Sequence, residues 1–153
     1  MRRTTADVTA TVAPTLSGEK ILALQKIVRR VPVADHVVRY AMKLVRLTRP
    51  QDGVPQFIRD YVSWGAGPRA SQYLVLGAKA RAVLQGRFHA GVDDVRAVAL
   101  PVLRHRIVTN FNAEAEGLKP DELIRRLMDT VGEQEVAAEE KLPPVFRKEG
   151  GRE

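Results

Sequence analysis

The sequence predicts an all-α protein, a compact bundle of four to five short helices. Hydrophobic residues make up 44% of the 153 residues but aromatic residues only 5%, and the apolar share consists mostly of Ala, Val and Leu, which suit packed helices. Apolar residues recur at the spacing of three and four that marks one face of a helix. The length is sufficient for one domain with a hydrophobic core, and no internal repeat divides it.

We expect three parts along the chain. Residues 1–16 are rich in Thr, Ala and Val without a helical period, and they are predicted to form a linker or interdomain arm. Residues 17–132 carry the helical pattern and form the domain. Residues 133–153 are strongly charged, contain a Pro-Pro and a Gly-Gly pair, and are predicted to be a disordered tail.

The first two helices of the domain each have an apolar stripe. The first starts after Ser17, whose side chain suits an N-cap, and is stopped or kinked by Pro32. The second ends before Pro50. The inward residues predicted for the first helix are Ile21, Leu24, Ile27, Val28 and Val31, and those predicted for the second are Val37, Ala41, Leu44, Val45 and Thr48.

Residues 51–67 contain one proline and three glycines besides it, which interrupt regular structure. The spacing allows one short helical turn among the apolar and aromatic side chains Phe57, Ile58, Tyr61, Val62 and Trp64. Trp64 stands directly before a glycine, and we expect it to anchor the loop to the core; the alternative is that its ring stacks on a nucleic acid base.

The third helix is predicted from Pro68 to about Gln85, because proline after glycine is a common helix start and Gly86 follows its end. Its predicted inner stripe consists of Tyr73, Leu74, Gly77, Ala80 and Leu84. The glycine in this stripe stands among alanines, so a neighbouring helix can approach closely, although glycine costs about 1 kcal/mol relative to alanine in a helix.

Two more helices follow. The fourth covers GVDDVRAVALPVLRHRIV, with Asp93 or Asp94 as its cap and a kink expected at Pro101. The stretch NFNAEAEGLKP is predicted to be a loop, and the fifth helix starts near Pro120. The predicted inward residues are Val95, Val98, Ala99, Val102 and Leu103 in the fourth helix, and Leu123, Ile124, Leu127, Met128 and Val131 in the fifth.

Composition excludes several classes of site. The chain has no cysteine, so disulfides and thiolate metal sites are excluded. His36, His89 and His105 do not form a metal-ligand spacing; no metal site is expected, and the first two are interpreted as surface or cap residues. No apolar run approaches the roughly 20 residues that cross a bilayer, and the first residues lack the apolar segment of a secretory signal. We therefore expect a cytoplasmic protein without a membrane contact.

The charge of the chain is unevenly spread. There are 25 Lys and Arg against 18 Asp and Glu, a net charge of +7. Residues 1–132 hold 21 basic and 12 acidic residues, whereas residues 133–153 hold 4 and 6. A basic body suggests an anionic partner, which is a nucleic acid, an acidic protein surface or a nucleotide. Basicity does not choose among these, and arginines on solvated helix faces account equally well for most of the charge.

The stretch SWGAGPRASQ, residues 63–72, raises the main question about function. It places Arg69 in the first turn of the third helix, where free N–H groups already contribute about half a positive charge. A further positive charge there costs about 0.3–1 kcal/mol unless an anion binds. A phosphate could accept bonds from the N–H groups and the guanidinium, with room left by the glycines and Ala66. Equally, Arg69 could point into solvent or pair with Asp60, and the residues alone leave both readings open.

The same stretch carries a family resemblance. GAGPRASQ followed by AKARAVLQGRFHAGVDDVRAVALPVLRHRI is similar to the C-terminal helical lid of MoxR-type AAA+ ATPases. LSGEKILALQKIVRRVPVADHVVRYAMKLVRLTRP resembles the opening helices of that lid, and RRTTA resembles its junction with the α/β nucleotide-binding core. The resemblance covers residues 2–131 and is specific as a set of motifs.

The resemblance implies a role for the start of the third helix. Arg69 would be the sensor-2 residue, aimed at the γ-phosphate of ATP, with Gly67 and Pro68 setting the helix start that positions it. The nucleotide would belong to its own subunit or to a neighbour in a ring, expected to be a hexamer. Partners would be the AAA+ core domain and neighbouring subunits. The family couples ATP turnover to chaperone-like remodelling of other proteins, often ones with von Willebrand A-type domains.

The sequence lacks the catalytic parts of an ATPase. It has no Gly-Lys-Ser/Thr of a P-loop and no apolar strand ending in paired acids that could hold Mg²⁺. We therefore expect no enzymatic activity and no bound cofactor for these 153 residues alone, with ATP and Mg²⁺ entering only in the complete protein. The chain is interpreted as a lid without its core: an excised domain, a truncated gene product or a split partner.

The alternative function is that of a stand-alone basic helical module that binds nucleic acid or an acidic protein surface. Its candidate contact residues are Lys26, Arg29, Arg30, Arg39, Lys43, Arg46 and Arg49. No aromatic residues alternate with them and no recognition-helix motif is present, so an interface with a subunit or core is preferred. The triplet Arg104-His105-Arg106 is expected to be a salt-bridged helix end, with a phosphate contact as the alternative.

Overall fold

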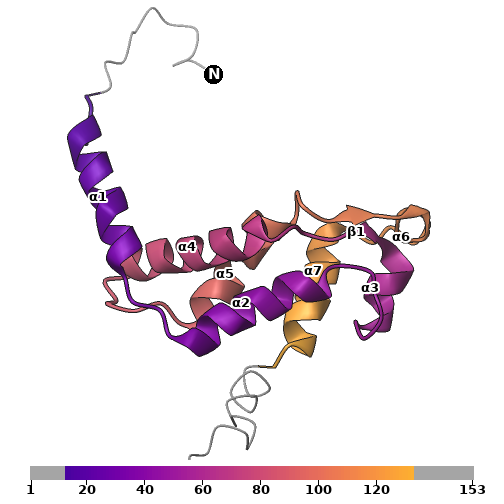
Figure 1. Ribbon diagram of the computed structural model, residues 1–153. Coiled ribbons are helices and arrows are strands. Elements are labelled where there is room, and N and C mark those ends of the chain that lie inside the picture. The colour runs from indigo at the N-terminus through magenta and orange to yellow at the C-terminus, as the bar shows by residue number, and fades with distance from the viewer. Residues whose placement is uncertain (1–12, 133–153) are drawn as a thin grey trace, which may run out of the picture.

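The computed structural model describes residues 13–132, so the predicted tail 133–153 and most of the predicted linker 1–16 lie outside the described residues. The described part is helical apart from one two-stranded ribbon, which confirms the all-α class, but it holds seven helices rather than four to five. In chain order the elements are α1 (Gly18–Arg30), α2 (Asp35–Leu47), α3 (Gln56–Tyr61), β1 (Val62–Trp64), α4 (Arg69–Leu84), α5 (Val92–Leu103), β2 (Val108–Thr109), α6 (Phe111–Ala115) and α7 (Pro120–Thr130) (Figure 1).

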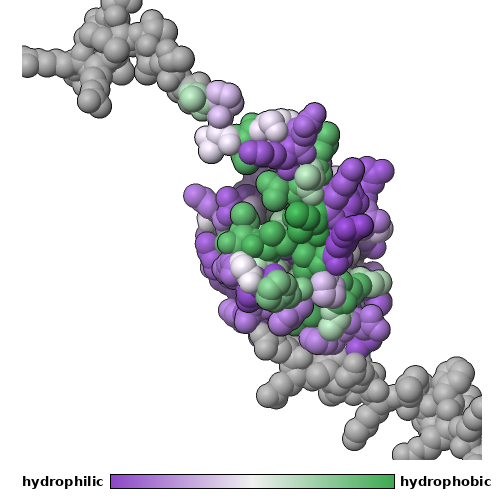
Figure 2. Space-filling view, turned by 90° about the vertical axis from the view of Figure 1, so that its left-hand side faces the viewer, coloured by the Kyte–Doolittle hydropathy of each residue, from purple (hydrophilic) through white to green (hydrophobic). Residues whose placement is uncertain are grey.

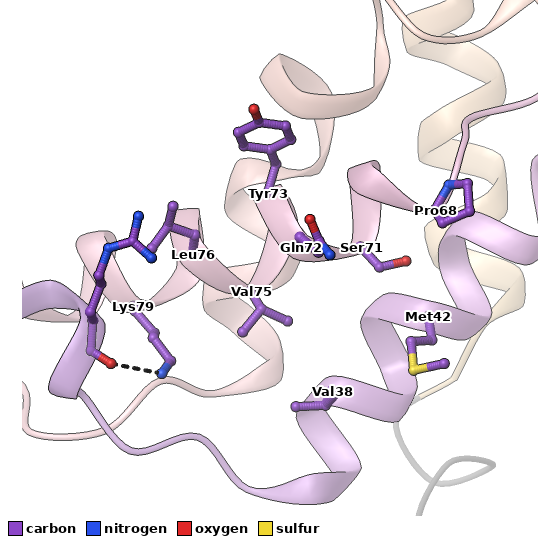
Figure 3. A pocket seen from close by; sticks show the side chains of 10 residues that line it. Val38, Met42, Pro68, Ser71, Gln72, Tyr73, Val75, Leu76 and Lys79 are labelled. Carbon is purple, nitrogen blue, oxygen red and sulfur yellow. Dashed lines mark hydrogen bonds between the residues drawn. The ribbon is translucent and has the colours of Figure 1, made fainter.

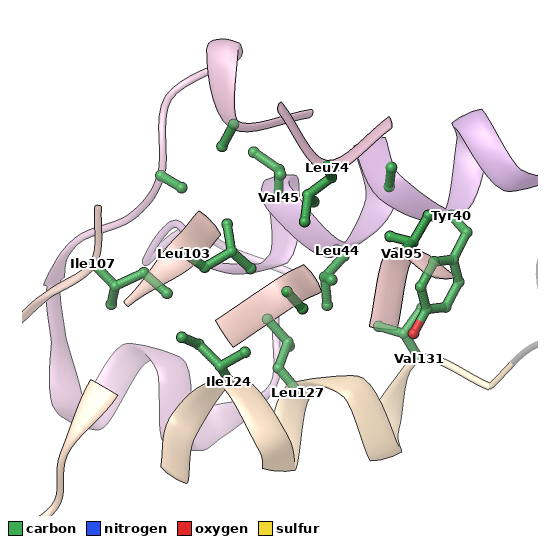
Figure 4. Close-up of a cluster of buried hydrophobic side chains, with 14 of the residues drawn as sticks. Tyr40, Leu44, Val45, Leu74, Val95, Leu103, Ile107, Ile124, Leu127 and Val131 are labelled. Atoms are coloured by element: carbon green, nitrogen blue, oxygen red, sulfur yellow. The ribbon is translucent and has the colours of Figure 1, made fainter. Parts of the chain in front are cut away.

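The core lies where α2, α4, α5 and α7 meet. α4 and α5 form the most extensive pair, α2 packs on both of them, and α7 packs on α5 and α2. Figure 4 shows large side chains of these four helices pointing toward one another, among them the fully buried Tyr40, Leu44, Leu74, Leu103 and Leu127. Burial of each such side chain contributes about 1.5–3 kcal/mol. One continuous apolar cluster therefore fixes the four helices relative to each other.

The inward stripes predicted for α2 and α7 are confirmed. All five residues predicted for α2 are buried, and so are those predicted for α7 except Met128, which is half-buried. In α5, three of the five predicted residues are buried and two are half-buried. α2 and α7 are strongly amphipathic, so the helical period alone fixes which side faces the core.

The stripe predicted for α4 is wrong except for Leu74. The side that faces the core consists of Ala70, Leu74, Ala78 and Ala82. Tyr73 is 47% exposed and Leu84 is 87% exposed. Polar and apolar residues are spread around this helix without one apolar side, so size and not polarity decides which side turns inward: small residues let the backbone of α5 come close. The prediction of a close neighbour is confirmed, since a Cβ added at Gly77 would lie 3.3 Å from a methyl carbon of Val98.

Most of the stripe predicted for the first helix does not face a core: Val31, just after the helix, is buried and Val28 is half-buried, but the other three residues are exposed. Ser17 caps α1 as predicted, by accepting a bond from the N–H of Lys20 (3.3 Å), but none of the helix residues is buried. Its large apolar side chains Ile21, Leu22, Leu24 and Ile27 remain about half exposed, and Figure 2 shows a hydrophobic surface, bordered by polar residues, on this side of the domain. The helical spacing of apolar residues correctly identified the apolar side of α1. It does not show whether the surface that covers this side belongs to the other helices of the domain.

The ribbon was not predicted. β1 and β2 are antiparallel, with Val62 opposite Thr109 and Trp64 opposite Val108, and the register is irregular between the two pairs. This irregularity matters because Val62 is buried whereas Trp64 is 74% exposed, although residues two apart in a regular strand share a side. The expectation that Trp64 anchors the loop to the core is therefore wrong.

The stretch predicted as a loop before the last helix contains the short helix α6. The Asn110 side chain caps it by accepting a bond from the N–H of Ala113 (3.1 Å). The amide of the same side chain donates to the carbonyl of Asp60 (2.7 Å). A five-residue helix is too short to show a helical period, which explains why the pattern did not reveal it.

Asp94 closes the turn between α4 and α5. The N-cap of α5 is Gly91 and not Asp93 or Asp94 as predicted, but the Asp94 carboxylate, in the first turn, accepts a bond from the N–H of Gly91 (2.9 Å). It also forms ion pairs with Arg81 (2.6 Å) and Arg87. The Asp94 side chain is fully buried. Hydrogen bonds from the Arg87 guanidinium hold the pKa of this carboxyl far below its ordinary value, although burial opposes the shift.

Asp94→Asn should destabilise the domain by roughly 2–3 kcal/mol, because it keeps the shape but removes the charge that two arginines face. The folded-state pKa of Asp94 lies below that of the unfolded chain. Its stabilising contribution is therefore present at neutral pH and is lost progressively as the pH falls below about 4. Urea unfolding at pH 7 and at acid pH measures both effects. The exposed neighbour provides the control Asp93→Asn, and equal destabilisation by both substitutions would contradict the assignment.

Candidate functional site

The start of α4 is positioned by the end of α2. The N–H of Ala66 donates to the Thr48 hydroxyl (2.8 Å), and the carbonyl of Ala66 accepts from Nε of Arg49 (2.9 Å). The Thr48 hydroxyl itself donates to the carbonyl of Val45 (2.7 Å), and both Thr48 and Ala66 are fully buried. Both backbone groups of Ala66 are thus satisfied by the C-cap residue of α2 and the residue that follows it. Sequence reasoning missed this role, although a threonine on an otherwise apolar stripe signals a buried hydroxyl that needs a partner.

Gly65 allows this close approach. A Cβ at this position would lie 2.4 Å from the carbonyl oxygen of Thr48, so any other residue would push the two segments apart. The expectation that the glycines and Ala66 leave room for an anion is therefore wrong for Gly65 and Ala66, which face α2. It holds for Gly67, where no atom lies within 4 Å of an added Cβ.

Arg69 is the first residue of α4, and its side chain is exposed. Within residues 13–132 it makes no hydrogen bond or ion pair; Asp60, the partner considered for it, instead accepts from the Gln56 amide (2.7 Å). The N–H groups of Ala70 and Ser71 already donate to carbonyls of the preceding turn (3.0 and 3.1 Å). An anion at this helix start would therefore be bound mainly by the guanidinium, which is a correction to the expected role of the N–H groups.

A second arginine lies near the same side of α4. The guanidinium carbon of Arg106 lies 5.1 Å from the centroid of the Tyr73 ring, and its N–H donates to the carbonyl of Val102. Its neighbour Arg104 pairs with Asp121 (2.9 Å), which confirms the expected salt bridge for that member of the triplet alone. The sequence analysis placed Tyr73 on the inner side of the helix and therefore did not predict its contact with Arg106.

A groove begins beside the candidate site and runs between α2 and α4 toward the end of α1 (Figure 3). Its volume is about 730 Å³. Val38 and Met42 of α2 face Val75 of α4 across it, as Figure 3 shows, and the Lys79 amine donates to the carbonyl of Arg29 (3.3 Å) at one end. The groove thus combines an apolar floor with cationic groups.

The structure also shows where the other candidate residues from the sequence analysis lie. His36 and His89 are exposed, as expected. Arg49 is half-buried and bonded to the backbone, so it does not belong to a free basic surface. None of the described helices is both long and apolar enough to span a bilayer. Within residues 13–132, the His, Asp and Glu side chains form no group of three or more that could hold a metal ion.

Comparison with known proteins agrees with this arrangement. Residues 56–127, from the start of α3 into α7, match the family model of the AAA lid domain. Over 137 residues the chain is 33% identical to the chaperone MoxR1 of Mycobacterium tuberculosis, a match that covers 86% of this chain. The chain carries the lid region of a MoxR-type AAA+ ATPase.

Two further relatives support the lid assignment. The MoxR protein of Paracoccus denitrificans is 43% identical over 58 residues, which are 37% of this chain and 17% of that protein. The crystal structure of a candidate ATPase from Cytophaga hutchinsonii superimposes with a TM-score of 0.70 and 29% identity, covering 74% of this chain and 35% of that one. The lid spans only 36% of the length of MoxR1.

Gly65→Ala should destabilise the lid by about 1–3 kcal/mol, because the new methyl group meets the Thr48 carbonyl. Gly67→Ala is the matched control two residues away, where the space is open, and it should leave stability nearly unchanged. Thermal unfolding followed by circular dichroism compares the two. If both variants melt with the wild type, the close approach of the two segments is not required.

Proposed function

We propose that this chain is the nucleotide-sensing lid of a MoxR-type AAA+ ATPase and that Arg69 is its sensor-2 residue, contacting the γ-phosphate of ATP. The observation that carries the proposal is an exposed guanidinium without a partner among the described residues, placed at a helix start that α2 holds in position. The helix start lies inside the region that matches the AAA lid domain.

The chemistry of arginine suits this role. A guanidinium is always charged and can form two parallel bonds to one phosphate. Arg69 would gain such bonds while the γ-phosphate is present and lose them when the phosphate leaves, so the favoured position of the lid would differ between ATP and ADP. Arg69 carries no group that activates water, so the nucleophile and Mg²⁺ would be held by the nucleotide-binding core.

The proposed partners follow from the family. We propose that the lid works with an AAA+ core domain and neighbouring subunits in a ring, a hexamer by resemblance, with Arg69 serving the nucleotide of its own or of the next subunit. ATP and Mg²⁺ would be bound in the complete protein. The proposed output is chaperone-like remodelling of other cytoplasmic proteins, including ones with von Willebrand A-type domains.

Arg69→Ala in the complete ATPase should lower turnover by at least about tenfold, because charge stabilisation of the transferred phosphoryl group is lost. The lid itself should remain folded, since the side chain is exposed. Steady-state ATP hydrolysis and circular dichroism measure the two effects. Arg125→Ala, which removes another exposed arginine on α7, is the control, and a wild-type rate for Arg69→Ala would refute the sensor role.

A second function is favoured by the groove: docking of an acidic protein surface. The three helices that border it, α1, α2 and α4, together hold ten Lys and Arg but only one Glu and one Asp. The floor between them is apolar, which fits a partner with apolar side chains flanked by acids better than it fits nucleic acid. The groove adjoins the candidate site, since Pro68 and Tyr73 line it, so a docked partner would lie next to Arg69.

A synthetic helical peptide with leucines on one side and glutamates on the other should bind the chain, with an affinity that falls as salt increases. Met42→Glu should weaken this binding at least about tenfold, because Met42 is half exposed on the groove floor and a glutamate there repels the peptide. Fluorescence anisotropy measures the binding. Equal binding of a duplex DNA, unaffected by Met42→Glu, would instead favour the nucleic acid alternative.

A further inference from the structure

We infer that Arg106, stacked on Tyr73, is a second cationic ligand for the polyphosphate that Arg69 contacts. The inference rests on the proposed sensor function and extends the site to a residue from a different part of the chain. Arg106 follows the end of α5, whereas Arg69 begins α4. Because α4 and α5 are packed against each other, the two arginines reach the same end of the pair.

Helix geometry places Arg69 and Tyr73, the residue that Arg106 stacks on, on neighbouring turns of α4. Tyr73 follows Arg69 by four residues in α4, and side chains four apart lie on one side of a helix with Cβ atoms about 5–6 Å apart. The guanidinium carbon of Arg106 lies 5.1 Å from the centre of the Tyr73 ring. The second cation therefore lies beside a residue that is about one helical turn beyond Arg69.

Arg106 is held in place but not neutralised. It is half-buried, donates to the carbonyl of Val102 and contacts the His105 ring. Among residues 13–132 no carboxylate pairs with it. The nearby Arg104 differs, because its guanidinium forms an ion pair with Asp121. A stacked arginine with its remaining N–H groups open is preorganised for an anion.

The charge pattern indicates the class of ligand. Arg69, Arg106 and the positive end of α4 concentrate charge that no acid of residues 13–132 pairs with, and an anion bound there would be stabilised. Two guanidinium groups at one helix end can bind one phosphate together or successive phosphates of a chain, and the proposed sensor role supplies a chain of three. The ligand inferred is therefore a nucleoside triphosphate held through its phosphate chain.

Inorganic tripolyphosphate is the probe, because it isolates the phosphate contacts from those of a base. The full chain is titrated at low ionic strength, and the side-chain Nε–H signals of the arginines are followed by NMR. Those of Arg69 and Arg106 should shift together with one dissociation constant. Arg106→Gln and Arg69→Gln should each weaken binding roughly three- to tenfold, and Arg125→Gln should have no effect.

A pair of variants tests the stacking itself. Tyr73→Phe keeps the aromatic ring and should bind tripolyphosphate like the wild type, whereas Tyr73→Leu should weaken binding as Arg106→Gln does. Both variants are expected to fold, since Tyr73 is about half exposed and lies outside the buried core. Wild-type binding by Tyr73→Leu would overturn the positioning role of the ring.

The remaining outcomes separate this inference from the sensor proposal. If Arg69→Gln weakens binding and Arg106→Gln does not, the inference is overturned and the sensor role of Arg69 stands. If Arg125→Gln weakens binding as much as Arg106→Gln, the attraction is general and the inference is overturned. If no arginine signal shifts, the inference is again overturned, while the sensor proposal is judged by ATP turnover in the complete protein.

Discussion

The candidate site depends on the contact between the end of α2 and the residues before α4. Thr48 and Arg49 satisfy both backbone groups of Ala66, and Gly65 leaves no space for a side chain against Thr48. A buried backbone N–H or carbonyl without a partner costs about 1–3 kcal/mol, so this pairing strongly restricts the path of the loop. The loop in turn sets where α4 begins, and therefore where Arg69 is presented.

α4 is held in place at both of its ends, but the arginines at its two ends differ in whether an acid pairs with them. At the C-terminal end, Arg81 and Arg87 are paired with the buried Asp94. At the N-terminal end, Arg69 is exposed and no acid among the described residues balances it. Two arginines near the end of α4 are thus neutralised by an acid, whereas the arginine at its start is not. This contrast is the electrostatic argument for a ligand that arrives from outside the lid.

The sequence predicted some elements better than others, because the pattern of apolar residues is clearer in some elements than in others. α2 and α7 have one apolar side, so their inward residues were predicted correctly. α4 has polar residues on several sides and no single apolar side, and its inward side is set by the small size of Ala70, Ala78 and Ala82, which periodicity does not detect. The ribbon strands are too short to alternate visibly. Arg69 could be singled out from local helix electrostatics, but the bonds that position it join residues 17 and 18 apart in sequence.

The exposed apolar side of α1 bears on how such a lid could act. None of the residues of α1 is buried, yet the helix packs on α4, whose other contacts are with α2 and α5 of the core. A domain or protein that bound to α1 would therefore act on α4, the helix that carries Arg69. Because α4 is fixed at both ends, a shift of its start would move the four-helix core as a unit rather than bend it. Nucleotide contact at Arg69 and mechanical contact at α1 would then be coupled through one rigid element, which is the property that a lid needs to transmit the state of the phosphate.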